Sequence, residues 1–309
     1  MTRPDEPLDD TQRRRVLARA GAGVLMATLA GCATAPPPAP ALPPEAPKPP
    51  PKPPRIGLAL GGGAARGFAH IGVIQVLEEQ GLKPELVVGT SAGSLVAAMW
   101  AAGKRGAELG ALALSMDEAT LADWAYPGRG LLRGEAVARY VREHTGGKTI
   151  EQMKTPLGIV ATDLLTGQGI LFQRGDPGVA VRASSAVPAV FQPVSIGGRE
   201  YVDGGLVAPI PVQYAKQMGA QLVIAVDISA ATEDQPTTDA VKMLLQTFAI
   251  MGRNLGAYQL READVVIRPK LAGVSGADFG ARRLALLAGR EAALAALAEL
   301  KTKIAAKTL

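Results

Sequence analysis

Short apolar runs alternate with segments of helical periodicity along the chain after residue 55. Residues 55–60 form an apolar run that ends in glycines, which is typical of a buried parallel strand. Within residues 66–80, Ile71, Ile74 and Leu77 recur at helical spacing and predict a helix. Further strands are predicted at 85–88, 157–161, 222–227 and 264–267, and further helices at 94–101 and 281–306.

Repeated alternation of strand and helix predicts an α/β fold with a parallel sheet and helices on both of its faces. Residues 103–146 are predicted to be mostly helical, with breaks at Pro127 and Gly128. Trp124 and Tyr126 lie near its break. This stretch is a lid, a lipid-contact region, or ordinary helical packing. The composition agrees with a well-buried body, because 48% of the 309 residues are hydrophobic and 20% are charged.

Charge and cysteine content exclude some classes of function. The formal net charge is +5, and no basic stripe is interleaved with aromatic residues, so we do not expect a nucleic-acid partner. The chain has a single cysteine, Cys32, which excludes an internal disulfide framework and any metal site made of several cysteines.

The first 31 residues have the organisation of an export signal. Arg13–Arg15 precede a short apolar run at residues 20–29, and small residues lead to Cys32. The run is shorter than the roughly 20 apolar residues of a spanning helix, and its flanking arginines disfavour a buried core helix. Leu29–Cys32 resembles the lipobox of bacterial lipoproteins, which implies lipidation of Cys32 and anchoring in the bacterial cell envelope, facing the periplasm. Residues 13–17 also resemble a twin-arginine motif, so two export routes stay open.

A proline-rich segment follows the cysteine. Residues 36–54 contain half of the chain's 24 prolines, which favours polyproline II and a semi-rigid spacer. The sequence therefore predicts three parts, namely an export signal at 1–31, a lipidated cysteine with its tether at 32–54, and a folded domain at 55–309.

A serine between two glycines follows the second predicted strand. Gly89–Gly93 fits the pattern Gly-x-Ser-x-Gly and lies between a predicted strand and a predicted helix, as a nucleophile elbow does. Gly89 and Gly93 permit a sharp turn that presents Ser91 at the start of the helix, where the dipole favours developing negative charge. The alternative is a simple glycine-rich turn.

A second glycine-rich segment, Gly61–Gly67, follows the first predicted strand and opens the first predicted helix. It fails as a dinucleotide fingerprint because Arg66 occupies the third glycine position, and as a Walker loop because it lacks the Gly-Lys-Ser/Thr ending. Its backbone N–H groups suit an oxyanion hole beside Ser91, where each donor contributes about 3 kcal/mol. The candidate donors are Gly61, Gly62, Gly63 and Ala64.

A serine nucleophile also needs a base. The two histidines, His70 and His144, lie at positions that packing or capping explains, and no histidine follows residue 144, which disfavours a Ser-His-acid triad. Asp203 ends an extended segment and precedes two glycines, so it is a candidate base. A plain Asp-Gly hairpin turn is an equally good interpretation of these residues.

In this order and spacing the motifs resemble the patatin-like phospholipase family, from residue 56 to residue 306. Gly61–Gly67, Gly89–Gly93 and Asp203–Gly205 are similar to the family's oxyanion loop, its serine elbow and its Asp-Gly block. Two lesser blocks also fit, at 161–164 and at 183–188, the second leading to Phe191 and Pro193.

The resemblance implies a three-layer α/β/α fold with a mostly parallel central sheet. It also implies a Ser-Asp dyad in which Ser91 is the nucleophile and Asp203 the base, with Arg66 orienting the oxyanion loop. An acyl-enzyme would form on Ser91, and neither a metal nor an organic cofactor would be required. The implied substrate is a phospholipid or another acyl ester.

Two other functions remain open on the sequence. One is a catalytically idle envelope lipoprotein that binds lipid or acts as a scaffold, and the other is a nucleotide-binding protein on a similar scaffold. The acyl substrate, the membrane leaflet and the oligomeric state are not predicted.

Overall fold

The computed structural model describes residues 52–117, 119, 123, 128–229, 237–276 and 278–308. The predicted export signal, Cys32 and nearly all of the predicted tether lie outside the described residues, as do Trp124 and Tyr126 of the predicted lid. Pro50–Leu309 forms one compact unit.

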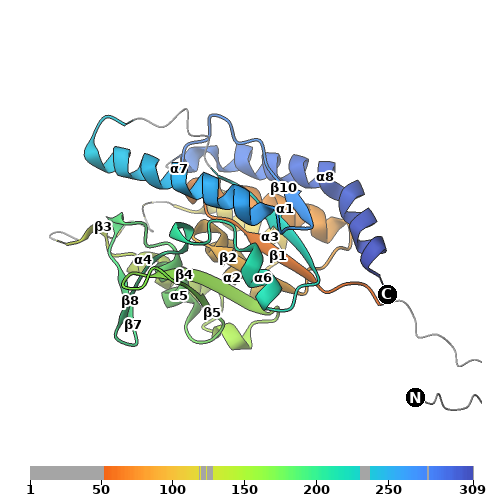
Figure 1. The fold of residues 1–309 in the computed structure, drawn as a ribbon, viewed down its shortest axis with the longest axis horizontal. Coiled ribbons are helices and arrows are strands. Elements are labelled where there is room, and N and C mark those ends of the chain that lie inside the picture. Colours follow the sequence, from red (N-terminus) through yellow and green to blue (C-terminus); the bar gives the residue numbers. More distant parts are fainter. Residues whose placement is uncertain are drawn as a thin grey trace, which may run out of the picture. The chain divides into compact units, whose positions relative to one another are not determined.

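Parallel strands form the centre of an eight-stranded sheet in the described part of the chain (Figure 1). The strand order is β10-β9-β1-β2-β4-β8-β7, and β5 pairs with β4. Every residue of β1, β2, β4 and β9 is buried, because helices cover both faces of these strands and favour continuous apolar runs. The parallel strands are β1 (Ile56–Leu60), β2 (Leu86–Thr90), β4 (Leu157–Asp163), β9 (Leu222–Val226) and β10 (Val265–Ile267).

Antiparallel strands extend the sheet beyond β4. The strands β5 (Gly169–Phe172) and β8 (Arg199–Asp203) both pair with β4, and β7 (Val194–Ile196) pairs with β8. Away from the main sheet, β3 (Gly130–Leu132) and β6 (Ala189–Phe191) form a two-stranded parallel sheet. Apart from an extended segment before Asp203, the sequence analysis predicted none of these strands, since they are short and only partly apolar.

Helices cover the sheet on both faces, and alternate residues of a strand enter different cores. Leu58 and Leu60 of β1 belong to one cluster of buried residues, and Ala59 belongs to the other. The predicted three-layer α/β/α architecture with a mostly parallel sheet is therefore confirmed. The first cluster includes α1 (Phe68–Glu79), α2 (Ala92–Ala101), α3 (Gly106–Ser115), α4 (Glu135–His144), α5 (Pro177–Ser184) and α8 (Arg282–Lys307), and the second includes α6 (Val212–Gln217) and the end of α7 (Ala240–Leu260).

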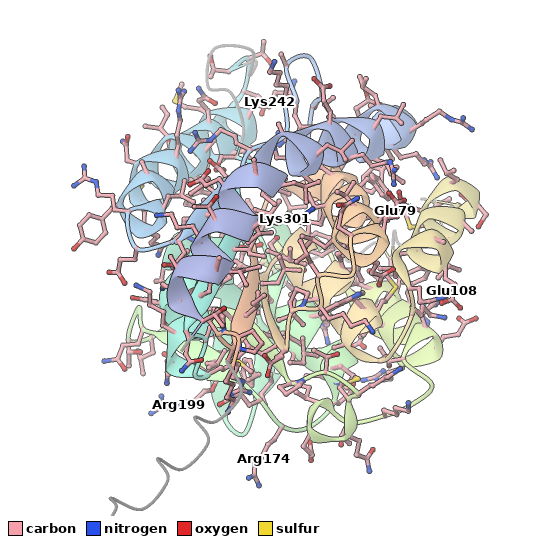
Figure 2. All side chains as sticks on the ribbon, turned by 90° about the vertical axis from the view of Figure 1, so that its right-hand side faces the viewer. Glu79, Glu108, Arg174, Arg199, Lys242 and Lys301 are labelled. Carbon is pink, nitrogen blue, oxygen red and sulfur yellow. The ribbon has the colours of Figure 1, made fainter. Side chains whose placement is uncertain are left out.

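The helices α1 and α8 cross at very short range. A Cβ atom on Gly72 would lie 2.0 Å from the carbonyl oxygen of Leu286, and one on Gly289 would lie 2.0 Å from that of Ala69. At the end of α1, the guanidinium of Arg290 pairs with Glu79. Figure 2 shows Glu79 on α1 and Lys301 on the neighbouring α8. The two glycines thus let α8 close the fold over α1, which is next to the glycine-rich loop.

Candidate functional site

Ser91 lies in a sharp turn between β2 and α2, where its backbone φ of 51° is in the region that favours glycine. Its glycine neighbours have no room for a side chain. A Cβ atom on Gly89 would lie 2.5 Å from the backbone of Gly93, and one on Gly93 would lie 2.2 Å from the carbonyl oxygen of Leu60. The predicted elbow geometry is therefore present, and it places Ser91 at the N-terminus of α2.

Two further serines hold the backbone of this turn. The Ser91 amide donates to Ser184 Oγ at 2.8 Å, and Ser184 Oγ in turn donates to the carbonyl oxygen of Val160 at 2.6 Å. Ser94 Oγ donates to the carbonyl oxygen of Ser91 at 2.6 Å. Sequence reasoning placed Ser184 in a family-like block but gave it no role. Its contact spans 93 residues of sequence, so no local pattern indicated it.

Asp203 is the last residue of β8 and lies opposite Ala161 of β4. The strand leads into the short turn η4 (Gly204–Leu206) and then into α6, so the interpretation of Asp203 and Gly204 as a hairpin turn is wrong. The carboxylate is buried, with 6% of the residue exposed. Its Oδ1 atom accepts a hydrogen bond of 2.6 Å from the Gly205 amide, whereas Oδ2 has no partner of normal geometry among the described residues.

The environment of Asp203 changes its acidity. Burial raises the pKa of Asp203 to about 6, and hydrogen bonding from the Ser91 hydroxyl and from the Gly205 amide lowers that pKa in part. The Ser91 side chain is thus near enough to act on the carboxylate, although the two groups do not make a fully aligned hydrogen bond. Such a loose contact is common before substrate binds. The pair combines a buried carboxylate that can accept a proton with a hydroxyl that can donate one.

The glycine-rich loop lies directly against Ser91, since a Cβ atom on Gly62 would be 3.3 Å from the Cβ atom of Ser91. Two of the four predicted oxyanion donors are already used. The Gly61 amide donates to the carbonyl oxygen of Val226 at 3.1 Å, and the Gly62 amide to that of Pro209 at 2.9 Å. The prediction is corrected here: Gly61 and Gly62 shape the loop, and Gly63 and Ala64 are the remaining candidate donors.

Arg66 ties the same loop to the chain beyond β9. Its Nε atom donates to the carbonyl oxygen of Ile228 at 2.9 Å, and the residue is buried. Burial lowers the pKa of Arg66, and the charge of Asp227 acts in the opposite direction. These contacts are compatible with the predicted loop-orienting role of Arg66.

Both histidines are engaged away from Ser91. His70 is fully buried, and its Nε2 atom lies 2.8 Å from the carbonyl oxygen of Gly61. Burial lowers the pKa of His70 to about 4, so the ring is neutral at pH 7. Its Nε2–H donates the hydrogen bond that the Gly61 carbonyl oxygen accepts. His144 is the last residue of α4, where its Nδ1 atom bonds the carbonyl oxygen of Tyr140 and its ring stacks on that side chain. The described contacts therefore support no Ser-His pair.

One segment that the sequence analysis did not single out connects the parts of the site. This segment comprises residues 207–210. Its Pro209 carbonyl oxygen accepts the hydrogen bond from the Gly62 amide, and its Ala208 carbonyl oxygen accepts one of 2.8 Å from the Thr90 hydroxyl. Gln259 of α7 then fixes the segment from its other side, accepting from the Ile210 amide and donating to Val207 O, both at 3.0 Å. Position 259 carries no motif, so only the folded chain reveals this role.

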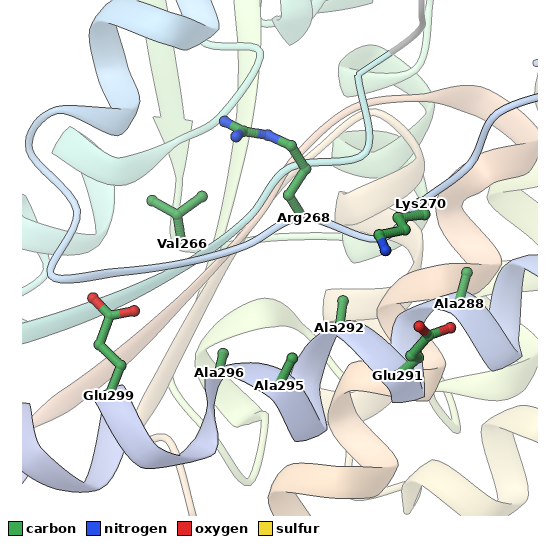
Figure 3. A pocket seen from close by; sticks show the side chains of 9 residues that line it. All are labelled: Val266, Arg268, Lys270, Ala288, Glu291, Ala292, Ala295, Ala296 and Glu299. Atoms are coloured by element: carbon green, nitrogen blue, oxygen red, sulfur yellow. The ribbon is translucent and has the colours of Figure 1, made fainter.

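A groove of about 340 Å³ lies apart from Ser91 and Asp203, between β10 and α8 (Figure 3). Val266 and alanines of α8 line it together with charges of both signs, from Arg268, Lys270, Glu291 and Glu299. In the described residues no group of three or more His, Cys, Asp or Glu side chains could hold a metal ion. Over the same part of the chain, no helix has the length and apolar character needed to span a membrane.

Comparison with known proteins identifies relatives over the same region. The chain is 42% identical over 189 residues to an uncharacterized NTE family protein of Mycobacterium tuberculosis, covering 60% of this chain and 52% of that protein. It is 34% identical over 192 residues to patatin-like phospholipase domain-containing protein 6 of Mus musculus, covering 59% of this chain and 14% of that protein. The chain thus spans about half the length of its mycobacterial relatives.

A solved structure and a family model agree with these relatives. VipD from Legionella pneumophila has a similar fold, with a TM-score of 0.56 and 15% sequence identity, over 84% of this chain and 68% of that chain. The model of the family described as patatin-like phospholipase matches residues 58–216, which are about half of the chain and include Ser91 and Asp203. The chain therefore belongs to the patatin-like phospholipase family.

Proposed function

We propose that the protein is a serine acyl-ester hydrolase that acts on phospholipids or related esters through a Ser91–Asp203 dyad. The observation that carries the proposal is the state of Asp203. Its carboxylate is buried, its pKa is raised to about 6, and its Oδ2 atom has no aligned partner, while the Ser91 hydroxyl is near enough to lower that pKa. A raised pKa makes a carboxylate a stronger base at neutral pH.

In the proposed acylation step, Asp203 accepts the proton of Ser91 Oγ while that oxygen attacks the ester carbonyl carbon. The carbonyl π electrons move to oxygen, and the amides of Gly63 and Ala64 together with the N-terminus of α2 stabilise the oxyanion. When the tetrahedral intermediate collapses, the bond to the alcohol breaks, and Asp203 returns the proton to the leaving oxygen. An acyl ester on Ser91 remains.

Deacylation repeats these steps with water as the nucleophile. Asp203 takes one proton from the water while the water oxygen attacks the acyl carbon. The bond between the acyl carbon and Ser91 Oγ then breaks, the protonated Asp203 returns its proton to Ser91 Oγ, and the free acid leaves. One carboxylate thus serves both halves of the cycle, which suits a group whose pKa lies near the working pH.

A fluorophosphonate probe tests the nucleophile directly. We expect the wild-type protein and a Ser115→Ala control, which alters an exposed serine on α3, to be labelled. Ser91→Ala should not be labelled, and Asp203→Asn should be labelled far more slowly. A folded wild-type protein that takes up no label, and hydrolyses neither membrane lipids nor short-chain nitrophenyl esters, would instead be the idle lipid-binding or scaffolding lipoprotein.

We further propose that Cys32 is lipidated and anchors the protein in the bacterial cell envelope, with the hydrolase domain facing the periplasm. The support is the sequence alone, namely the basic and apolar leader, the lipobox-like Leu29–Cys32 and the proline-rich tether. Metabolic labelling with a radioactive fatty acid should mark the wild-type protein and not Cys32→Ser. Equal labelling, or equal release of both proteins into the soluble fraction, contradicts the anchor.

A further inference from the structure

The helix α7 exposes an unusual amount of apolar surface. Of its 21 residues, Gly256, Gln259 and Leu260, all near its C-terminal end, are buried. Thirteen large apolar side chains are exposed in the described part of the chain, and six of them lie on α7, which makes this helix the main concentration of such side chains. A soluble surface rarely gathers apolar groups in this way without a partner. The six are Val241, Met243, Leu244, Ile250, Met251 and Tyr258.

These side chains form a stripe along the helix. Met243 and Ile250 are seven residues apart, as are Leu244 and Met251, and Tyr258 follows Met251 by another seven. Two turns of helix return a side chain to nearly the same direction, so the five residues share one face over roughly 22 Å. Tyrosine suits the edge of such a face because its ring is apolar and its hydroxyl is polar.

The charges on α7 favour one kind of partner. Between Ala240 and Leu260 the helix contains Lys242 and Arg253 and no acidic residue. Arg261 and Glu262 follow its end, and Glu262 pairs with Lys216. Asp239 caps the helix and pairs with Lys242. An apolar stripe on a helix with basic and no acidic side chains matches anionic lipid headgroups above an acyl-chain region, which is how interfacial helices bind membranes.

The buried end of α7 is connected to the candidate site. Gln259 makes two hydrogen bonds to the segment at residues 207–210, and that segment holds the Gly62 amide and the Thr90 hydroxyl beside Ser91. A bilayer in contact with α7 would therefore be coupled through one short segment to the glycine-rich loop and the serine turn.

We propose that the exposed stripe of α7 docks on the surface of an anionic phospholipid bilayer. As a way of bringing the site to its substrate, this docking rests on the proposed lipid-ester hydrolase function. It adds a contact that is separate from the lipid on Cys32, because it arises from the folded domain. A second copy of the chain is the competing occupant of the stripe, and the experiment separates the two.

A single fluorescent label reports the docking. Cys32→Ser removes both the predicted anchor and the chain's one cysteine, so Met251→Cys in that full-length background carries one label site. We expect the emission of an environment-sensitive dye there to rise by about twofold with phosphatidylcholine–phosphatidylglycerol vesicles, and to change little with phosphatidylcholine alone. The control is Arg174→Cys in the same background. Arg174 is exposed and lies at the opposite end of the view from Lys242 of α7 (Figure 2).

Three results overturn the proposal. The first is no change at position 251 with anionic vesicles, and the second is an equal change at position 174. The third is a change at position 251 that needs no vesicles and grows with protein concentration, which shows that α7 pairs with a second copy.

Hydrolysis provides the second measurement. We expect Ile250→Glu to lower hydrolysis of phosphatidylglycerol in vesicles about tenfold and to leave hydrolysis of a soluble nitrophenyl ester unchanged. Leu294→Glu is the matched control, because Leu294 and Ile250 are 51% and 46% exposed and Leu294 lies on α8, in the other helix layer. Equal losses in the two variants, or a loss on the soluble ester, overturn the proposal.

The docking and the proposed function can fail separately. The fluorescence experiment needs no catalysis and can be repeated with Ser91→Ala added. A positive signal at position 251 in a protein that hydrolyses nothing supports the docking proposal and contradicts the proposed hydrolase function. Normal hydrolysis of the soluble ester without that signal contradicts the docking proposal and leaves the proposed hydrolase function in place.

Discussion

At the scale of single residues, Ser91 and Asp203 are both held in states that the same residues avoid in an unfolded chain. Ser91 has a positive φ, and Asp203 has a carboxylate that is removed from water and has one oxygen without an aligned partner. The rest of the fold must stabilise both states. Their effects on stability and on activity can therefore be measured separately.

The activity should depend on the ionisation of Asp203. In the proposed mechanism only the carboxylate form of Asp203 accepts the Ser91 proton, and burial raises the pKa of Asp203 to about 6. We expect kcat/KM for a soluble ester to rise with pH through an apparent pKa near that value, leaving about a tenth of the plateau at one pH unit below it. A pH–rate profile measures this midpoint, and a midpoint near the ordinary aspartate pKa would contradict the assignment.

The same pKa shift predicts a change in stability. Because the pKa is raised in the folded state, this group's contribution to stability is fully present below the ordinary value of 3.8 and is lost as the pH rises through about 6. Asp203→Asn should therefore increase the free energy of unfolding at pH 7 by on the order of 3 kcal/mol. Denaturant unfolding at neutral and acidic pH tests this, and the gain should disappear near pH 4.

The backbone of Ser91 leads to another stability prediction. Glycine adopts the observed φ of 51° without the clash of a Cβ atom, whereas alanine keeps that clash. We expect Ser91→Gly to be more stable than Ser91→Ala by about 1 kcal/mol, with both proteins inactive. Equal unfolding midpoints for the two variants would show that the turn is not strained.

Much of the site could be predicted from the sequence because its residues lie in short local motifs. Ser91 and the glycine-rich loop were found from glycine spacing, and Asp203 was chosen over a hairpin turn with help from the family resemblance. The occupied amides of Gly61 and Gly62 could not be predicted, since their acceptors, Val226 and Pro209, are far away in the sequence. The role of Ser184 could not be predicted either, because the Ser91 amide that it binds is 93 residues away in the sequence.

At the scale of elements, buried parallel strands were predicted well and partly exposed strands were not. The strands β1, β2 and β9 are continuous apolar runs, which a single sequence displays clearly. By contrast, β5 is only half-buried and β7 has three residues, so their alternation is too short to recognise. The strands beyond β4 matter for the site, because β8 ends at Asp203 and pairs with β4, and β7 pairs with β8 on its other side.

The contact between α1 and α8 should be sensitive to one methyl group. A Cβ atom on Gly289 would lie 2.0 Å from a backbone oxygen, which cannot move aside as a flexible side chain can. We expect Gly289→Ala to lower the free energy of unfolding by about 2 kcal/mol. The control is Gly252→Ala on α7, where the nearest atom is 4.0 Å away and alanine should be neutral or stabilising. Thermal denaturation of both variants decides this, and a stable Gly289→Ala protein would contradict the close crossing.

At the scale of the whole molecule, Pro50–Leu309 contains its own cores on both faces of the sheet. We expect a protein that begins at Pro50 to unfold in a single transition, within about 2 °C of the full chain and with the same activity on a soluble ester. Calorimetry and ester hydrolysis measure this. A large loss of stability in the shorter protein would show that the N-terminal residues belong to the folded body.

The strain at Ser91 and the buried charge at Asp203 also bear on how such a protein evolves. Each residue lowers stability and is kept, in the proposed mechanism, for its chemistry. A lineage released from selection for that chemistry would therefore gain stability by losing either one. Replacements at these two positions should therefore be among the first to spread in a decaying copy of the gene. Retention of both, in the geometry described above, is what we expect of a lineage that depends on the proposed turnover.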